Sequence, residues 1–127
     1  MRGYMTRILI ADPNAASRKA MALLLTQRLG IIHIYQVDDV ESLIRTLAEC
    51  PIELLLLDWR LYGAPAPETC RLLKKAYPDL KVVLLSVNSD DKQKAQDAGA
   101  IFVHKGASPE DVVAALQQTL LTPTDGL

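Results

Sequence analysis

The sequence has few cysteines, no long apolar run and no excess of charge of one sign. Two cysteines, Cys50 and Cys70, are too few for a disulfide scaffold or a metal knuckle, and each falls where a helical pattern would bury a small residue. We expect both to be reduced, structural thiols. No apolar stretch approaches the roughly 18 residues of a membrane-spanning helix, and the N-terminus has no continuous apolar segment typical of a leader. These absences predict a soluble, cytoplasmic protein.

The balance of charge bears on possible partners. There are 14 basic and 15 acidic residues, so the chain lacks the positive field that phosphate contacts with DNA or RNA require. We therefore expect no direct binding of nucleic acid and no binding to a membrane. With 127 residues, 50% of them hydrophobic, the chain fits one domain with a full core. We assign this domain to residues 1–121, and residues 122–127 have the composition of a tail or the start of a linker.

Strand and helix patterns alternate through the chain. Strands are expected at 7–11, 31–37, 52–57, 81–86 and 101–104. Helices are expected at 14–29, 39–50, 68–77, 91–98 and 109–121. Connections this short require parallel strands, right-handed crossovers and helices on both faces of the sheet. The predicted fold class is α/β, a doubly wound five-stranded parallel sheet of the flavodoxin-like type, with strand order 2-1-3-4-5.

Polar residues stand where the expected strands end. Asp12 follows the first strand, Asp58 follows the largely aliphatic run 52–57, and Ser86 ends the fourth strand. Lys105 comes just after the fifth. In the order 2-1-3-4-5 the first and third strands are neighbours at the topological switch point, so Asp12 and Asp58 should face each other across one site.

Four segments in this order and spacing resemble the receiver domain of two-component response regulators, the CheY-like family. They are Ile8-Leu9-Ile10-Ala11-Asp12, Leu57-Asp58-Trp59-Arg60-Leu61, Leu84-Leu85-Ser86 and Asp97-Ala98-Gly99-Ala100-Ile101-Phe102-Val103-His104-Lys105. The resemblance covers residues 7–121. It implies phosphorelay signal transduction, with self-phosphorylation and slow self-dephosphorylation in place of turnover of a metabolite, so we do not expect an enzyme.

The resemblance also implies roles for single residues. Asp58 matches the aspartate that accepts a phosphoryl group from a histidine kinase or phosphotransfer protein. Ser86 matches the hydroxyl residue that swings toward the phosphoryl oxygens, and Lys105 the lysine that pairs with them. Phe102 matches the aromatic switch position. The implied recipient of the signal is an output domain or an effector protein.

The implied cofactor is Mg²⁺, and the sequence departs from the family pattern at its site. Asp12, Asp58 and the backbone carbonyl of Arg60 match metal ligands, but Pro13 stands where the family usually has a second acid. Losing one charge and one ligand should weaken or abolish binding of Mg²⁺. The Asp12-Pro13 pair equally fits a helix N-cap and first turn, so capping alone and capping with metal binding both remain open.

Other interpretations accompany these. Asp58 could merely accept hydrogen bonds from the next loop, Ser86 and Lys105 could be ordinary residues at strand ends, and Phe102 could belong to the core. Receivers of this kind often form homodimers through the fourth helix, fifth strand and fifth helix, but the charged residues of the fourth helix equally fit a solvated face. His33 and His104 lie on different strands without a supporting ligand cluster, so we expect no metal there.

Pro13 motivates an alternative function, a phosphorylation-independent pseudo-receiver that acts through protein contacts. A flavodoxin-like cofactor binder shares the strand order but needs a phosphate-cradling loop after the first strand. Residues 12–16 place a carboxylate there and contain no glycine, which argues against that function.

Overall fold

The five strands run parallel in the order β2-β1-β3-β4-β5, as the sequence predicts. The structure is a computed structural model that describes residues 5–121, so the expected tail or linker at 122–127 lies outside the described residues. The strands are β1 (Arg7–Ala11), β2 (His33–Val37), β3 (Leu54–Asp58), β4 (Lys81–Ser86) and β5 (Ile101–His104). The helices are α1 (Ala15–Leu29), α2 (Val40–Glu49), α3 (Ala66–Ala76), the 3-10 helix η2 (Ser89–Asp91), α4 (Lys92–Asp97) and α5 (Pro109–Leu121).

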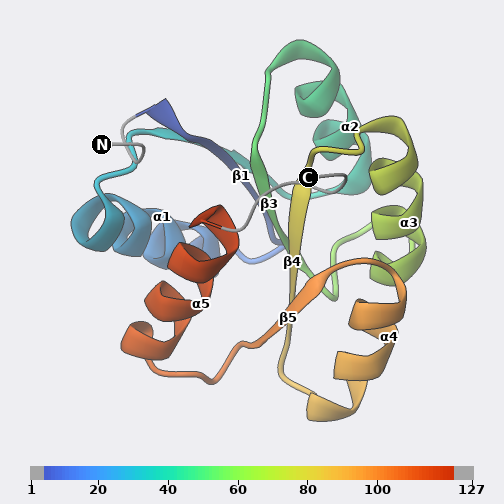
Figure 1. Cartoon of the computed structure of the whole chain (residues 1–127). Helices are drawn as coiled ribbons and strands as arrows, with labels where there is room; N and C mark the ends of the chain where they lie inside the picture. The colour runs from blue at the N-terminus through green and yellow to red at the C-terminus, as the bar shows by residue number, and fades with distance from the viewer. Residues whose placement is uncertain (1–4, 122–127) are drawn as a thin grey trace.

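Helices cover both faces of the sheet (Figure 1). Helices α2, α3 and α4 lie on one face, and α1 and α5 pack side by side on the other. Successive side chains of β3 alternate between the cores on the two faces of the sheet. Leu55 and Leu57 join the core beneath α2, α3 and α4, and Leu54 and Leu56 join the core beneath α1 and α5. Because both faces of this central strand are buried, its sequence is almost continuously aliphatic. No helix among residues 5–121 is long and apolar enough to span a bilayer.

Differences from the sequence prediction occur at β2, α3, β3 and α4. β2 begins at His33 because the Ile31 amide still closes α1, donating to the Leu25 carbonyl at 3.3 Å, with Gly30 in the left-handed conformation at φ 70°. α3 begins at Ala66, two residues earlier than expected. Pro67 fits its first turn because the amide proton that proline lacks has no intrahelical partner there.

The other two differences concern β3 and α4. β3 begins at Leu54 and includes Asp58 as its last residue, whereas the sequence suggested 52–57. The helix expected at 91–98 is α4, one residue shorter at each end, and the 3-10 helix η2 precedes it in the segment predicted to be a turn. The start of α5 agrees with the prediction, and the Ser108 hydroxyl accepts a hydrogen bond from the Asp111 amide at 3.2 Å.

Candidate functional site

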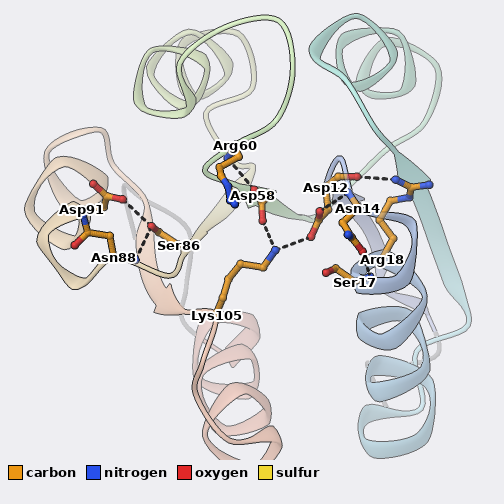
Figure 2. A network of polar contacts seen from close by, with 10 residues as sticks. All are labelled: Asp12, Asn14, Ser17, Arg18, Asp58, Arg60, Ser86, Asn88, Asp91 and Lys105. Carbon is orange, nitrogen blue, oxygen red and sulfur yellow. Dashed lines mark hydrogen bonds and ion pairs between the residues drawn. The ribbon is translucent and has the colours of Figure 1, made fainter.

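Three of the predicted site residues meet at the carboxyl edge of the sheet. β1 and β3 pair with Ala11 beside Leu57, so Asp12 and Asp58 leave neighbouring strands at the same level. Lys105 follows β5 and reaches back toward both carboxylates (Figure 2). The strand order thus assembles residues that are far apart in the sequence.

Lys105 joins the two carboxylates. Its Nζ donates to Asp12 Oδ2 at 3.0 Å and forms a close ion pair with Asp58 Oδ2. Desolvation by burial lowers the pKa of Lys105, but the hydrogen bonds to Asp58 and Asp12, together with their charges, outweigh it and raise the pKa above its ordinary value. The side chain is therefore a firmly charged ammonium between two acids.

Asp58 is buried but borders accessible space. Its side chain is held by Lys105 on one oxygen and by the Arg60 amide, which donates to Oδ1 at 2.7 Å, on the other. Two neighbouring hollows share Asp58, Arg60, Lys105 and Ser17 in their walls. The carboxylate is therefore fixed in orientation and faces a space that a small reactant can enter. The sequence analysis did not single out Ser17, which α1 brings to this space.

Asp12 is not the N-cap of α1, which corrects the capping role that both interpretations left open above gave to it. The cap is Asn14, whose side-chain oxygen accepts from the Ser17 amide at 2.8 Å. Asp12 Oδ1 accepts from the Asn14 amide at 2.8 Å, and the Asp12 carbonyl accepts from Arg18 Nη1 at 2.7 Å. Asp12 therefore leaves its Oδ2 for the site, while the amide oxygen of Asn14 is occupied by the cap.

Ser86 lies at the same sheet edge but bonds elsewhere. Its hydroxyl donates to Asp91 Oδ2 at 2.6 Å and accepts from the Asn88 amide at 3.1 Å. Neither partner was predicted from the sequence, where Asn88 and Asp91 belong to a segment rich in turn-forming residues. The backbone still connects Ser86 to the site, since its carbonyl accepts from the Lys105 amide at 2.8 Å.

Phe102 and Arg60 complete the set of predicted site residues. Phe102 is half-buried and packs against the core cluster beneath α2, α3 and α4, as an ordinary core residue would. Arg60 is exposed, lines both hollows and contributes its amide to Asp58. The switch role of Phe102 and the metal-ligand role of the Arg60 carbonyl stay predictions.

The oxygen donors near Asp58 suit Mg²⁺ in kind. Asp12, Asp58 and the Arg60 carbonyl offer two carboxylates and a neutral oxygen, and Mg²⁺ commonly binds through one or two carboxylates and several waters. Pro13 lies in the wall beside Asp12 and adds no donor. Within residues 5–121, no group of three or more His, Cys, Asp or Glu side chains is placed to hold a metal ion. These donors match Mg²⁺ in chemical kind, but they are few for an ion that prefers six oxygen ligands.

Fold and site together define a class: a doubly wound α/β domain that presents an acidic pair and a lysine at the carboxyl edge of its sheet. The profile of the response regulator receiver domain matches residues 8–117, and the chain belongs to that family. Receiver domains belong to two-component signalling and are not classical enzymes. The family resemblance found in the sequence is therefore confirmed.

Known proteins resemble the chain over most of its length. Response regulator GacA of Pseudomonas aeruginosa is 28% identical over 117 residues, which cover 90% of this chain and 55% of that protein. The chain thus spans about half the length of the curated relatives it matches.

Two solved structures illustrate the likeness in fold. The N-terminal signal receiver domain of a response regulator from Bacteroides fragilis has a TM-score of 0.81 at 25% identity, covering 93% of this chain and 98% of that one. The chemotaxis response regulator CheY4 of Vibrio cholerae has a TM-score of 0.80 at 17% identity, covering 90% and 98% of the two chains. At that identity CheY4 supports the fold alone.

Proposed function

We propose that Asp58 accepts a phosphoryl group from a histidine kinase or a phosphotransfer protein, and that the domain then changes a protein-interaction surface. The observation that supports this most directly is the state of the Asp58 carboxylate. It is only 4% exposed, yet it lies in the walls of two hollows with one oxygen on an amide and the other on a lysine. A carboxylate held in this way is oriented for in-line attack.

The proposed step moves a phosphoryl group from a phosphohistidine nitrogen to Asp58. An oxygen of Asp58 attacks phosphorus, a P–O bond forms, and the N–P bond breaks with its electron pair remaining on the imidazole nitrogen. The product is an acyl phosphate, which water later cleaves to restore the carboxylate and release inorganic phosphate. This second step ends the signal.

In this scheme Lys105 pairs with a negative group both before and after phosphorylation of Asp58. Phosphorylation removes the formal charge of the Asp58 carboxylate, so the ammonium pairs with the incoming phosphoryl oxygens, as a compact cation with three donors can. Its raised pKa keeps it charged while it does so. Mg²⁺, held by Asp12, Asp58 and the Arg60 carbonyl, would supply further neutralisation of the negative charge that develops during transfer.

The output of the domain is proposed to be conformational. The phosphorylated site favours one of two pre-existing states through differential contacts with Ser86, and Phe102 and the surface of α4, β5 and α5 follow. Response regulators interact with kinases and with output or effector domains. We propose that this domain passes its signal to an output domain or effector protein and that it does so in the cytoplasm. We do not propose direct nucleic-acid binding by this domain, because its charges nearly cancel. A homodimer through the same surface remains a proposal of the same kind.

Intact mass spectrometry after incubation with acetyl phosphate and Mg²⁺ tests the proposal. The wild type should gain one phosphoryl group, Asp58→Asn should gain none, and Asp90→Asn should behave as the wild type because Asp90 is an exposed acid away from the pocket. Labelling that persists in Asp58→Asn would refute the assignment of the acceptor.

The pseudo-receiver is a second candidate that one observation favours. Pro13 replaces an acid, and Lys105 already pairs with both remaining carboxylates, so the site is partly neutralised by the protein itself. In this case the wild type stays unmodified by acetyl phosphate. Pro13→Asp would then become modified at Asp58, and the function of the natural chain would lie in its protein contacts.

A further inference from the structure

A buried carboxylate holds the hydroxyl group of Ser86. Ser86 is 4% and Asp91 9% exposed, and the 2.6 Å between Ser86 Oγ and Asp91 Oδ2 falls in the range of charge-assisted O–H···O⁻ bonds. In Figure 2 the Ser86 hydroxyl bonds to Asp91 and Asn88, on the side away from Asp58 and Lys105. The hydroxyl is thus turned from the acceptor site.

This contact uses the single proton of the hydroxyl. A serine side chain has one O–H donor, so Ser86 cannot donate to Asp91 and to a phosphoryl oxygen on Asp58 at the same time. The two contacts exclude each other. Any state in which Ser86 binds the phosphoryl group must first break the bond to Asp91.

Asp91 does not cap α4, although an aspartate just before a helix usually does so. It precedes α4 at the N-cap, yet its side chain makes no capping hydrogen bond. Within residues 5–121, the hydrogen-bond partner of its carboxylate is Ser86. The carboxylate is buried beneath a short helical segment for a contact with the site, and not for the start of the helix.

We propose that Asp91 is a positioning residue that holds Ser86 away from Asp58 until phosphorylation. The inference rests on the proposed function. When Ser86 turns to the phosphoryl group, the Asp91 carboxylate loses its donor inside the protein, and an unpaired buried charge is driven toward water. Asp91 ends η2 and directly precedes Lys92, so its movement displaces the start of α4. Asp91 thereby links the acyl phosphate to that helix.

Binding of the phosphoryl mimic beryllofluoride, with Mg²⁺ in excess and Trp59 fluorescence as the signal, measures the link. Asp91→Ala frees Ser86 and should tighten binding on the order of tenfold, the size expected for one hydrogen bond to a charged group. Asp91→Asn keeps the size and the acceptor but loses the charge, and should fall between. Asp90→Ala is the matched control, because this neighbouring acid is exposed, and its affinity should equal that of the wild type.

A double-mutant cycle shows whether Asp91 acts through Ser86. In a Ser86→Ala background, Asp91→Ala should leave the affinity for beryllofluoride unchanged. If Asp91→Ala binds beryllofluoride as the wild type does, or has the same effect with and without the Ser86 hydroxyl, the inference is overturned. A purely structural role would instead lower stability in both backgrounds and would not tighten binding.

The Ser86 rotamer in the unphosphorylated protein separates this inference from the proposed function. Three-bond coupling constants should report one rotamer in the wild type and an average over several in Asp91→Ala. If no variant binds beryllofluoride or takes up a phosphoryl group, the proposed function fails, and the rotamer comparison still decides the role of Asp91. The same single rotamer in both proteins would overturn it.

Discussion

Lys105 Nζ lies 3.0 Å from Asp12 Oδ2, although 93 positions separate the two residues in the chain. The same ammonium pairs with Asp58, so one cation serves two buried carboxylates. Two carboxylates that share a site repel each other, and burial increases the cost. The lysine therefore stabilises the fold at this edge of the sheet.

Replacement of Lys105 by methionine should destabilise the protein at neutral pH. The variant leaves Asp12 and Asp58 side by side without their cation, and we expect the free energy of unfolding to fall by about 2 kcal/mol, below the range for fully buried pairs because the lysine is partly exposed. Urea unfolding at pH 7 measures this. Lys105→Arg keeps the charge and should lose less; an equal deficit in Lys105→Arg and Lys105→Met would contradict the electrostatic explanation.

Lys105 should also shape stability at alkaline pH. Although desolvation lowers its pKa, the contacts with Asp58 and Asp12 raise it above 10.5 in the folded state. Such a group contributes stability that is fully present below the pKa of the unfolded state and is lost as pH rises through the folded pKa. Urea unfolding between about pH 9 and 12 should therefore show a steeper decline in the wild type than in Lys105→Met. Parallel declines would show that Lys105 is not the group responsible.

The fold could be predicted from the sequence because its main signals are local. Residues 54–57 are all leucine and both faces of their strand are buried, and alternating strand and helix patterns leave few arrangements for a parallel sheet. The start of β2 was missed because it depends on how α1 ends: the Ile31 amide closes that helix and delays the strand. Such a bond is not visible in hydrophobic periodicity.

The site was predictable where strand order alone brings residues together. Asp12 and Lys105 follow their strands and Asp58 ends β3, all at one edge of the sheet, so the topology is enough to place them. Asp91 was not found, because its contact with Ser86 depends on how the turn after β4 folds back. Asp12 was predicted to cap α1, but the helix begins only at Ala15, and Asn14 is its N-cap.

Gly63 should tolerate alanine less well than Gly30. Gly63 has φ 120°, and an added Cβ would lie 3.0 Å from Val40 Cβ, whereas Gly30 has φ 70° and nothing within 4 Å. We expect a loss of about 2–3 kcal/mol for Gly63→Ala. Gly30→Ala carries only the backbone cost, about 1 kcal/mol. Urea unfolding gives both values. Val40→Ala combined with Gly63→Ala should recover only the part of the steric loss that comes from Val40 Cγ2, because alanine keeps the Cβ. Equal losses at the two glycines would rule out the contact with Val40.

Cys70 should react with thiol reagents far more slowly than Cys50. Burial raises the pKa of the Cys70 thiol, against the opposing charges of Lys74 and Arg71, and its sulfur donates to the Ala98 carbonyl at 3.3 Å. Cys50 is only half-buried. The single-cysteine variants can be compared with Ellman's reagent. Cys50→Ser, which leaves Cys70, should react on the order of a hundredfold more slowly than Cys70→Ser, which leaves Cys50, because Cys70 becomes accessible only by local unfolding. Similar rates in the two variants would contradict the burial of Cys70.

Pro13→Asp should strengthen binding of Mg²⁺. The substitution adds a carboxylate beside Asp12, in the wall of the hollow that also contains Asp58. A third carboxylate raises both the charge and the number of oxygen donors near the ion. We expect the midpoint of a Mg²⁺ titration, followed by Trp59 fluorescence, to fall at least about tenfold, which corresponds to 1.4 kcal/mol of added binding free energy. Trp59 is suited to report this because it lines the neighbouring hollow.

Pro13→Asn is the matched control for this titration, because it also removes the proline ring and offers an oxygen without adding charge. If charge governs the site, Pro13→Asn should remain close to the wild type, and Lys105→Met in the Pro13→Asp background should tighten binding further by removing a competing cation. A wild type that already saturates as readily as Pro13→Asp would show that Asp12, Asp58 and the Arg60 carbonyl suffice. The proline would then have no bearing on the metal, and the reason for a pseudo-receiver would disappear.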